Sequence, residues 1–120
     1  MNNTLTEEQE CFIFVEWLRY NNIKAAHISN ESRSSSRAAM IRGAKLKRMG
    51  QSKGYWDYAV YVPQKDGKTK LIMIEMKRAK GGSVSEEQKE WGKVYESAGI
   101  PCKICKGADE AIEFVKSFLV

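Results

Sequence analysis

The chain has 120 residues and a mass of 13.7 kDa, which fits one domain over residues 1–120 and leaves little room for a second core. Hydrophobic residues make up 42% and charged residues 29%, which excludes a disordered tail and a disulfide-rich mini-protein. No apolar run approaches the roughly 20 residues of a membrane span, and the polar N-terminus is unlike a signal peptide. We therefore expect a cytoplasmic protein with reduced cysteines and no membrane partner.

The net charge of +5 comes from one segment of the chain. Between Ser32 and Trp56 there are seven basic residues and no acidic residue, and the rest of the chain has 13 basic against 15 acidic residues. Such a patch favours a polyanionic partner, and nucleic acid is the first candidate. The alternative is a solvated basic helix without a ligand. The candidate DNA-binding residues are Arg33, Arg37, Arg42, Lys45, Lys47, Arg48 and Lys53.

The first half of the chain predicts a helix, a short strand and a basic helix. Thr6 and Gln9 have the spacing of a capping box, and apolar residues then recur at helical spacing over residues 7–20. Residues 23–29 are typical of a short strand, and a serine-rich loop follows. Good helix formers occupy residues 37–49, and Gly50 is a plausible C-terminal stop.

The second half predicts a β-hairpin, a helix, a strand and a final helix. Residues 57–62 and 69–77 are rich in β-branched and aromatic residues and flank an Asp-Gly turn signal. Ser85 and Gln88 form a second capping box before a helix that extends to about residue 98. Residues 102–105 predict a strand and residues 108–119 a helix. The expected class is α/β or layered α+β, with one sheet flanked by helices.

The hairpin brings three charged residues together. Glu75 and Lys77 are two positions apart, so their side chains share one face of the strand. An odd-length loop centred on Asp66 places Asp57 directly opposite Glu75, whereas a two-residue loop pairs Asp57 with Met76. We predict the odd loop.

Two carboxylates facing each other require compensation. At about 4 Å and an effective dielectric near 20 they repel by about 4 kcal/mol, so the pair needs a cation or a raised pKa. Oxygen ligands of this kind suit Mg²⁺ or Mn²⁺, and Lys77 can orient a water or stabilise charge on a phosphate. The alternative is an ordinary salt bridge between Lys77 and a carboxylate on a solvated sheet face.

The same residues carry a resemblance to a known family. Asp57, followed after 17 residues by Glu75-Met-Lys77, matches the D…(D/E)xK motif of the PD-(D/E)XK nuclease superfamily. The strings GYWDYAV, IEMKRAKGGSVSEEQKEW and HISNE closely resemble the virus-type replication-repair nuclease (VRR-NUC) domain, and the resemblance extends from Glu7 over nearly the whole chain. It implies a restriction-endonuclease-like core, one mixed sheet with a central catalytic β-hairpin, and Mg²⁺-dependent hydrolysis of DNA phosphodiester bonds.

The resemblance also implies roles for individual residues. Asp57 looks like the metal-bridging carboxylate, Glu75 like the second metal ligand, and Lys77 like the lysine that positions the attacking water. The backbone carbonyl of Met76 resembles a further metal ligand. Gln88 matches the glutamine of the family's S-x-x-Q motif, although a capping box also needs a glutamine there.

The resemblance also concerns one acidic residue of the first helix and the position before Asp57. Glu10 resembles the additional acid of related nucleases, and helical periodicity favours it over the alternatives Glu7 and Glu8 because it shares a face with Phe14 and Trp17. The proline that normally precedes the aspartate is Trp56 here, which is either a base-stacking or a packing residue.

The size of the chain resembles single-domain, virus-encoded members of the family, which would act in the host cytoplasm. This implies a homodimer that cuts branched DNA such as four-way (Holliday) junctions in DNA repair, since paired cuts need two sites. The alternatives are a monomeric flap or single-strand nuclease and a non-catalytic nucleic-acid-binding module. Apolar residues that could cover the dimer interface are Trp17, Phe118, Leu119 and Val120.

Overall fold

The computed structural model describes residues 4–28, 36–50 and 52–119. Within these residues the chain forms helices and strands in the predicted order, α, β, basic α, β, β, α, β, α. The helices are α1 (Glu7–Tyr20), α2 (Arg37–Arg48), α3 (Glu86–Ser97) and α4 (Ala108–Lys116). The strands are β1 (Lys24–His27), β2 (Tyr58–Pro63), β3 (Thr69–Lys77) and β4 (Cys102–Lys106).

The strands form one mixed sheet in the order β1-β2-β3-β4. β1, β2 and β3 are antiparallel neighbours, whereas β4 runs parallel to β3. The predicted α+β class with one mixed sheet and a central hairpin is therefore confirmed.

The hairpin register follows the predicted odd loop. Tyr58 lies opposite Ile74 and Pro63 opposite Thr69, so the loop covers residues 64–68 and is centred on Asp66. The Asp66 carboxylate accepts a hydrogen bond from the Lys68 backbone N–H at 2.9 Å, which closes the turn. One step beyond the last pair of the ladder, this register places residue 57 opposite residue 75.

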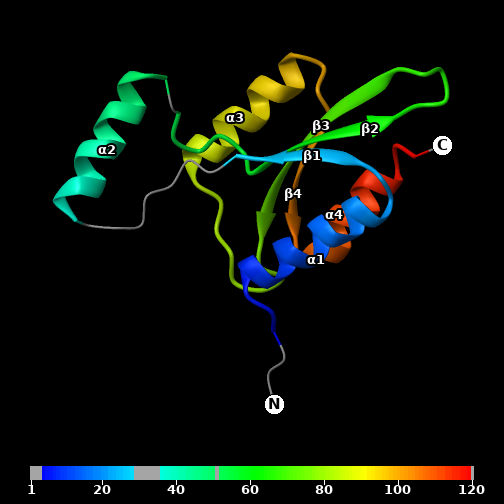
Figure 1. Ribbon diagram of the computed structural model, residues 1–120, viewed down its shortest axis with the longest axis horizontal. Helices are drawn as coiled ribbons and strands as arrows, with labels where there is room; N and C mark the ends of the chain where they lie inside the picture. The colour runs from blue at the N-terminus through cyan, green and yellow to red at the C-terminus, as the bar shows by residue number, and fades with distance from the viewer. Residues whose placement is uncertain (1–3, 29–35, 51, 120) are drawn as a thin grey trace.

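Strand parity divides the hairpin side chains between two faces. Even-numbered residues, including Val60 and Ile74, pack with α1 and α4 in one core, and odd-numbered residues, including Ala59 and Met73, pack with α3 in the other. Figure 1 shows α1 and α4 together on one side of the sheet and α3 on the other. Because side chains alternate along a strand, Glu75 and Lys77 of β3 belong to the α3 face.

Helix α2 stands apart from the rest of the molecule (Figure 1). None of its residues that the structure describes is buried, and it belongs to none of the element pairs that pack extensively. It lies between β1 and β2 in the chain, and Ile28 N–H donates to the Asp57 carbonyl at 2.6 Å. The segment that carries α2 therefore leaves the sheet and returns to it beside Asp57.

The apolar surface differs from the one predicted. Trp17 and Phe118 are partly buried against the α1–α4 core. Trp17 lies in α1 and Phe118 just after α4, and both complete the packing of these two helices. Leu119 is exposed, and Val120 lies outside the described residues. The exposed apolar side chains of α1 are Phe12, Ile13 and Tyr20.

No helix in the part of the chain that the structure describes is both long enough and apolar enough to cross a membrane.

Candidate active site

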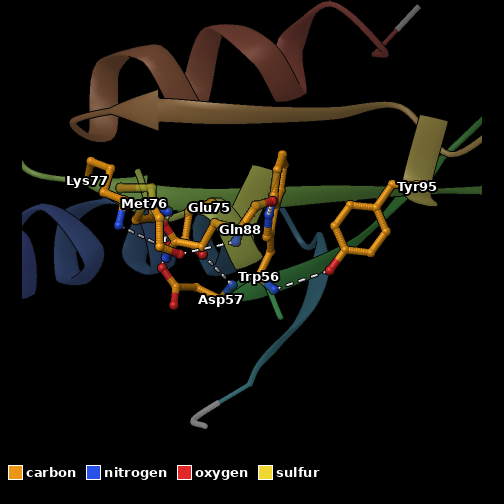
Figure 2. A network of polar contacts seen from close by, with 8 residues as sticks. Trp56, Asp57, Glu75, Met76, Lys77, Gln88 and Tyr95 are labelled. Carbon is orange, nitrogen blue, oxygen red and sulfur yellow. Dashed lines mark hydrogen bonds and ion pairs between the residues drawn. The ribbon is translucent and has the colours of Figure 1, made fainter. Parts of the chain in front are cut away.

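Glu75 is the most enclosed charged side chain of the hairpin, with 3% of its surface exposed. The Asp57 backbone N–H donates to its Oε1 at 3.2 Å, and the Gln88 Nε2 amide donates to its Oε2 at 2.8 Å. Lys77 Nζ lies 3.4 Å from the same Oε2. Figure 2 shows these side chains converging where β2 begins and β3 ends, and we call this region, residues 57 and 75–77, the hairpin base.

Asp57 is tied to the opposite strand through its own carboxylate. Its Oδ2 accepts a hydrogen bond from the Met76 backbone N–H at 3.1 Å. In an extended strand the N–H and C=O groups of one residue point toward the same neighbouring strand, so the Met76 carbonyl is also directed toward the Asp57 side. β2 begins at Tyr58, so at this level the β2 side of β3 is occupied by the Asp57 side chain rather than by a strand.

The surroundings of both carboxylates disfavour the charged form and raise the pKa of each. Burial, followed by the charge of Asp57, raises the pKa of Glu75 from its ordinary 4.5 to about 8, although Lys77 acts in the opposite direction. Burial is also the main cause that raises the pKa of Asp57, and the hydrogen bond from Met76 opposes it. The hairpin base therefore lacks positive charge, because one lysine does not balance a buried and a half-buried acid.

The donors at the hairpin base fit a hard divalent cation. Asp57, Glu75 and the Met76 carbonyl offer only oxygen atoms, which Mg²⁺ and Mn²⁺ prefer. Among the described residues, no group of three or more His, Cys, Asp or Glu side chains is placed to hold a metal ion. This agrees with Mg²⁺ chemistry, in which one or two carboxylates suffice and waters or substrate phosphates complete the shell.

Gln88 belongs to the capping box and also contacts Glu75, while its functional role stays a prediction. As the third residue of the α3 capping box, its Oε1 accepts from the Ser85 N–H at 3.1 Å. Because the carbonyl end of the amide is used there, the NH₂ end faces Glu75. The capping box thus fixes which end of the amide meets the carboxylate.

Comparison with known proteins supports the fold. No protein-family model matches the sequence, and no curated protein matches it either. A solved structure described as "VRR_NUC domain protein" aligns with a TM-score of 0.70 over 97% of this chain and 89% of its own, at 20% sequence identity. This chain has the VRR-NUC fold. The fold implied by the sequence resemblance is confirmed, and the chemistry has to be argued from the residues at the hairpin base.

On this VRR-NUC fold Glu10 is buried, and its Oε1 accepts from the Ala108 backbone N–H at 2.9 Å, at the start of α4. Its role as the additional acid of the site stays a prediction. Glu7 is the acid of α1 whose charge contributes to raising the pKa of Asp57. The sequence spacing could have indicated this residue, because Glu7 precedes Cys11 by four residues and Phe14 by seven and so shares their helix face.

The basic residues predicted to bind DNA lie mostly on α2. Lys53 follows α2 and lies 3.8 Å from Glu87 in a solvent-exposed ion pair, which stabilises little. Arg33 lies outside the described residues. The remaining five are exposed on α2, and they are Arg37, Arg42, Lys45, Lys47 and Arg48.

Trp56 is a packing residue, which decides between the two roles that its sequence position allowed. Only 3% of its surface is exposed, so neither face of its ring is available to a base. Its backbone N–H donates to the Tyr95 hydroxyl at 3.2 Å. Tyr95 was not predicted to belong near the site, because no sequence motif relates position 95 to position 56.

Proposed function

We propose that this protein is a divalent-metal-dependent nuclease that hydrolyses DNA phosphodiester bonds. The observation that carries the proposal is the Asp57–Glu75 pair, with Glu75 buried, Asp57 half-buried and Lys77 beside them at the end of a central hairpin. The VRR-NUC fold supports it, because the compared protein shares this architecture over most of its length.

Each residue of the hairpin base has a role in this proposal. The Asp57 and Glu75 carboxylates and the Met76 carbonyl hold Mg²⁺ or Mn²⁺. The bound ion polarises the phosphate and makes a water more acidic. Lys77 directs the attacking water and offsets negative charge on the phosphate, while Gln88 keeps Glu75 in place through the 2.8 Å hydrogen bond.

Helix α2 supplies the DNA contact in this proposal. It has five basic residues and no acidic residue, so its field attracts phosphates along its whole length. Its segment returns to the sheet beside Asp57, so DNA held by α2 lies near the hairpin base.

The proposed substrate is branched DNA, cut by a homodimer. One chain has one hairpin base, and symmetric cuts in two strands of a four-way junction need two. Phe12, Ile13 and Tyr20 give α1 an exposed apolar face, which supports association with a second copy.

The test is cleavage of end-labelled four-way, flap and linear DNA in Mg²⁺, Mn²⁺ or EDTA. We expect cleavage with either metal, strongest on the four-way junction, and none in EDTA. Preference for a flap or single strand identifies the alternative nuclease, and metal-independent binding without cleavage identifies a nucleic-acid-binding module.

A matched pair of variants separates the protein's own activity from contaminating nucleases. Glu75→Gln removes one proposed ligand at nearly constant volume, whereas Glu113→Gln removes an exposed acid of α4 that pairs with Lys116. We expect cleavage to be lost only in Glu75→Gln. Equal metal-dependent cutting by both variants would contradict the proposal.

A further inference from the structure

Trp56, the residue before Asp57, is held by one face of α3 at three points. Its Nε1–H donates to the Gln88 carbonyl at 2.8 Å and its backbone N–H to the Tyr95 hydroxyl at 3.2 Å. Its ring covers Gly92, where an added Cβ would lie 3.0 Å from Cζ2 of the indole. Residues 88, 92 and 95 share one helix face. We call this arrangement the Trp56 clamp, and Figure 2 shows Trp56 between Gln88 and Tyr95.

The helix face that holds Trp56 also holds the second carboxylate. Gln88 binds the indole through its backbone carbonyl and Glu75 through its side-chain amide. The Trp56 indole and the Oε2 atom of Glu75 are therefore both bound by Gln88 in the first turn of α3, and Tyr95 in its last turn holds the Trp56 backbone. A shift of Trp56 against α3 would change the position of Asp57 relative to Glu75.

The contacts are more specific than burial requires. A phenylalanine would fill the same apolar space between Ala59, Met73 and Tyr95, but it has no donor for the Gln88 carbonyl. Buried indole N–H groups normally find a partner, and here the partner belongs to the residue that orients Glu75. The two hydrogen bonds thus set the orientation of Trp56 as well as its burial.

We propose that Trp56 is a positioning residue that sets the geometry of the Asp57–Glu75 pair through α3. The backbone before Asp57 is held by a tertiary contact, because the Trp56 N–H group binds the Tyr95 hydroxyl. The consequence for catalysis rests on the proposed nuclease function, whereas the consequence for geometry does not.

The test compares Trp56→Phe with Trp91→Phe. Both remove an indole from the same aromatic cluster, since Trp91 packs against Tyr55 and Tyr95, but only Trp56 donates to Gln88. We expect Trp56→Phe to lower kcat by about tenfold or more, the lower end of the effect of groups that orient metal ligands, with KM for DNA unchanged. Mn²⁺ affinity, measured by calorimetry without DNA, should weaken by a similar factor. Trp91→Phe should leave both quantities near the wild-type values.

A second measurement is independent of nuclease activity. In ¹⁵N-labelled protein, the Gln88 side-chain amide and the Asp57 backbone amide should change chemical shift in Trp56→Phe and not in Trp91→Phe. If the wild type does not cut DNA, the proposed function fails, and these shifts with the Mn²⁺ affinity still decide the positioning role. If the wild type cuts DNA and the two variants match in kcat, Mn²⁺ affinity and amide shifts, the positioning role is overturned.

A third variant covers the case in which Trp56→Phe does not fold. Tyr95→Phe keeps the ring and removes only the hydroxyl that accepts from Trp56. We expect a smaller decrease in kcat and Mn²⁺ affinity with the same shift of the Asp57 amide. An unchanged Asp57 amide in this variant would also count against the clamp.

Discussion

Glu75 is bound by N–H donors on both of its oxygens, yet its charged form is still disfavoured. The hydrogen bonds from Asp57 and Gln88 orient the carboxylate, but burial removes the water that would stabilise its charge. The nearby Asp57 adds repulsion, which Lys77 only partly offsets. A site of this kind is ordered before the cation arrives, and the ion then relieves the repulsion instead of having to assemble its ligands.

A pH dependence of stability follows from this residue. Below pH 4.5 the folded and unfolded chains both hold the Glu75 proton, and between 4.5 and about 8 only the folded chain keeps it. The free energy of unfolding of the metal-free protein should therefore fall as pH rises through this range. Mg²⁺ or Mn²⁺ should raise Tm more at about pH 8 than at about pH 5, because the ion competes with protons for the carboxylates.

Thermal unfolding across this pH range measures the effect. Glu75→Gln should reduce both the loss of stability with rising pH and the increase in Tm caused by the metal ion. Glu113→Gln should keep both effects. A metal-free Tm that stays level from pH 5 to pH 8 in the wild type, or that falls equally in Glu75→Gln, would contradict the raised pKa of Glu75.

Glu10 has a structural role that can be separated from the proposed site. Glu10→Ala leaves the Ala108 N–H without its carboxylate partner, and an unsatisfied buried donor costs about 1–3 kcal/mol. We expect that loss in urea-induced unfolding, compared with little change for Glu8→Ala, an exposed acid of the same helical turn. Equal losses in both variants would mean that the α4 contact contributes nothing.

The residues of the hairpin base could be predicted because their relation is local. Parity along β3 joins Glu75 to Lys77, and the odd loop places Asp57 opposite Glu75. The choice between Glu7 and Glu10 could not be made in the same way. Both lie on apolar stripes of α1, and what separates them is the position of the α4 N-terminus, which depends on tertiary packing.

At the scale of elements, the sequence predicted the type and order of every helix and strand that the structure describes. The signals were capping boxes at Thr6 and Ser85, both present as predicted, and the turn around Asp66. The isolation of α2 was not predictable, because helix propensity shows that a helix can form and does not show what it packs against. None of its described residues is buried, so α2 has no extensive packing partner within the part of the fold that the structure describes.

The salt dependence of DNA binding tests α2. If about four to six of the seven basic residues between Ser32 and Trp56 contact phosphates, log affinity should fall with log salt concentration at a slope of roughly −3 to −6. Neutralising three of them together should reduce the size of the slope by about 3. The triple variant is Arg42→Gln, Lys45→Gln and Arg48→Gln.

The matched control neutralises the same number of exposed cations at the other end of the hairpin, with Lys65→Gln, Lys68→Gln and Lys70→Gln. We expect it to retain the wild-type slope. Because none of the described α2 residues is buried, the unfolding free energy of the α2 variant should stay near that of the wild type. An unchanged slope in the α2 variant would place the DNA elsewhere on the protein.

For the whole molecule, the two faces of the sheet have different compositions. The face under α1 and α4 is an apolar core, whereas the α3 face combines a smaller aromatic core with the charged hairpin base. This division could not be predicted from the sequence. It depends on which helix covers which face, and the sequence pattern of α3 does not show that Gln88, Gly92 and Tyr95 meet Trp56.

The assembly is the last property that the structure allows to be tested. The exposed side chains of Phe12, Ile13 and Tyr20 lie within one face of α1, and we expect this face to be covered by a second copy. Sedimentation equilibrium at micromolar concentration should give twice 13.7 kDa. Phe12→Asp should restore the monomer mass, because it places a charge in an apolar interface, whereas Val94→Asp, at an exposed site on α3, should not. A mass of 13.7 kDa for the wild type, both free and with a four-way junction present, would reject the dimer. A monomer has one hairpin base and makes one cut at a time, so that result would favour a flap or single-strand substrate over a symmetric junction.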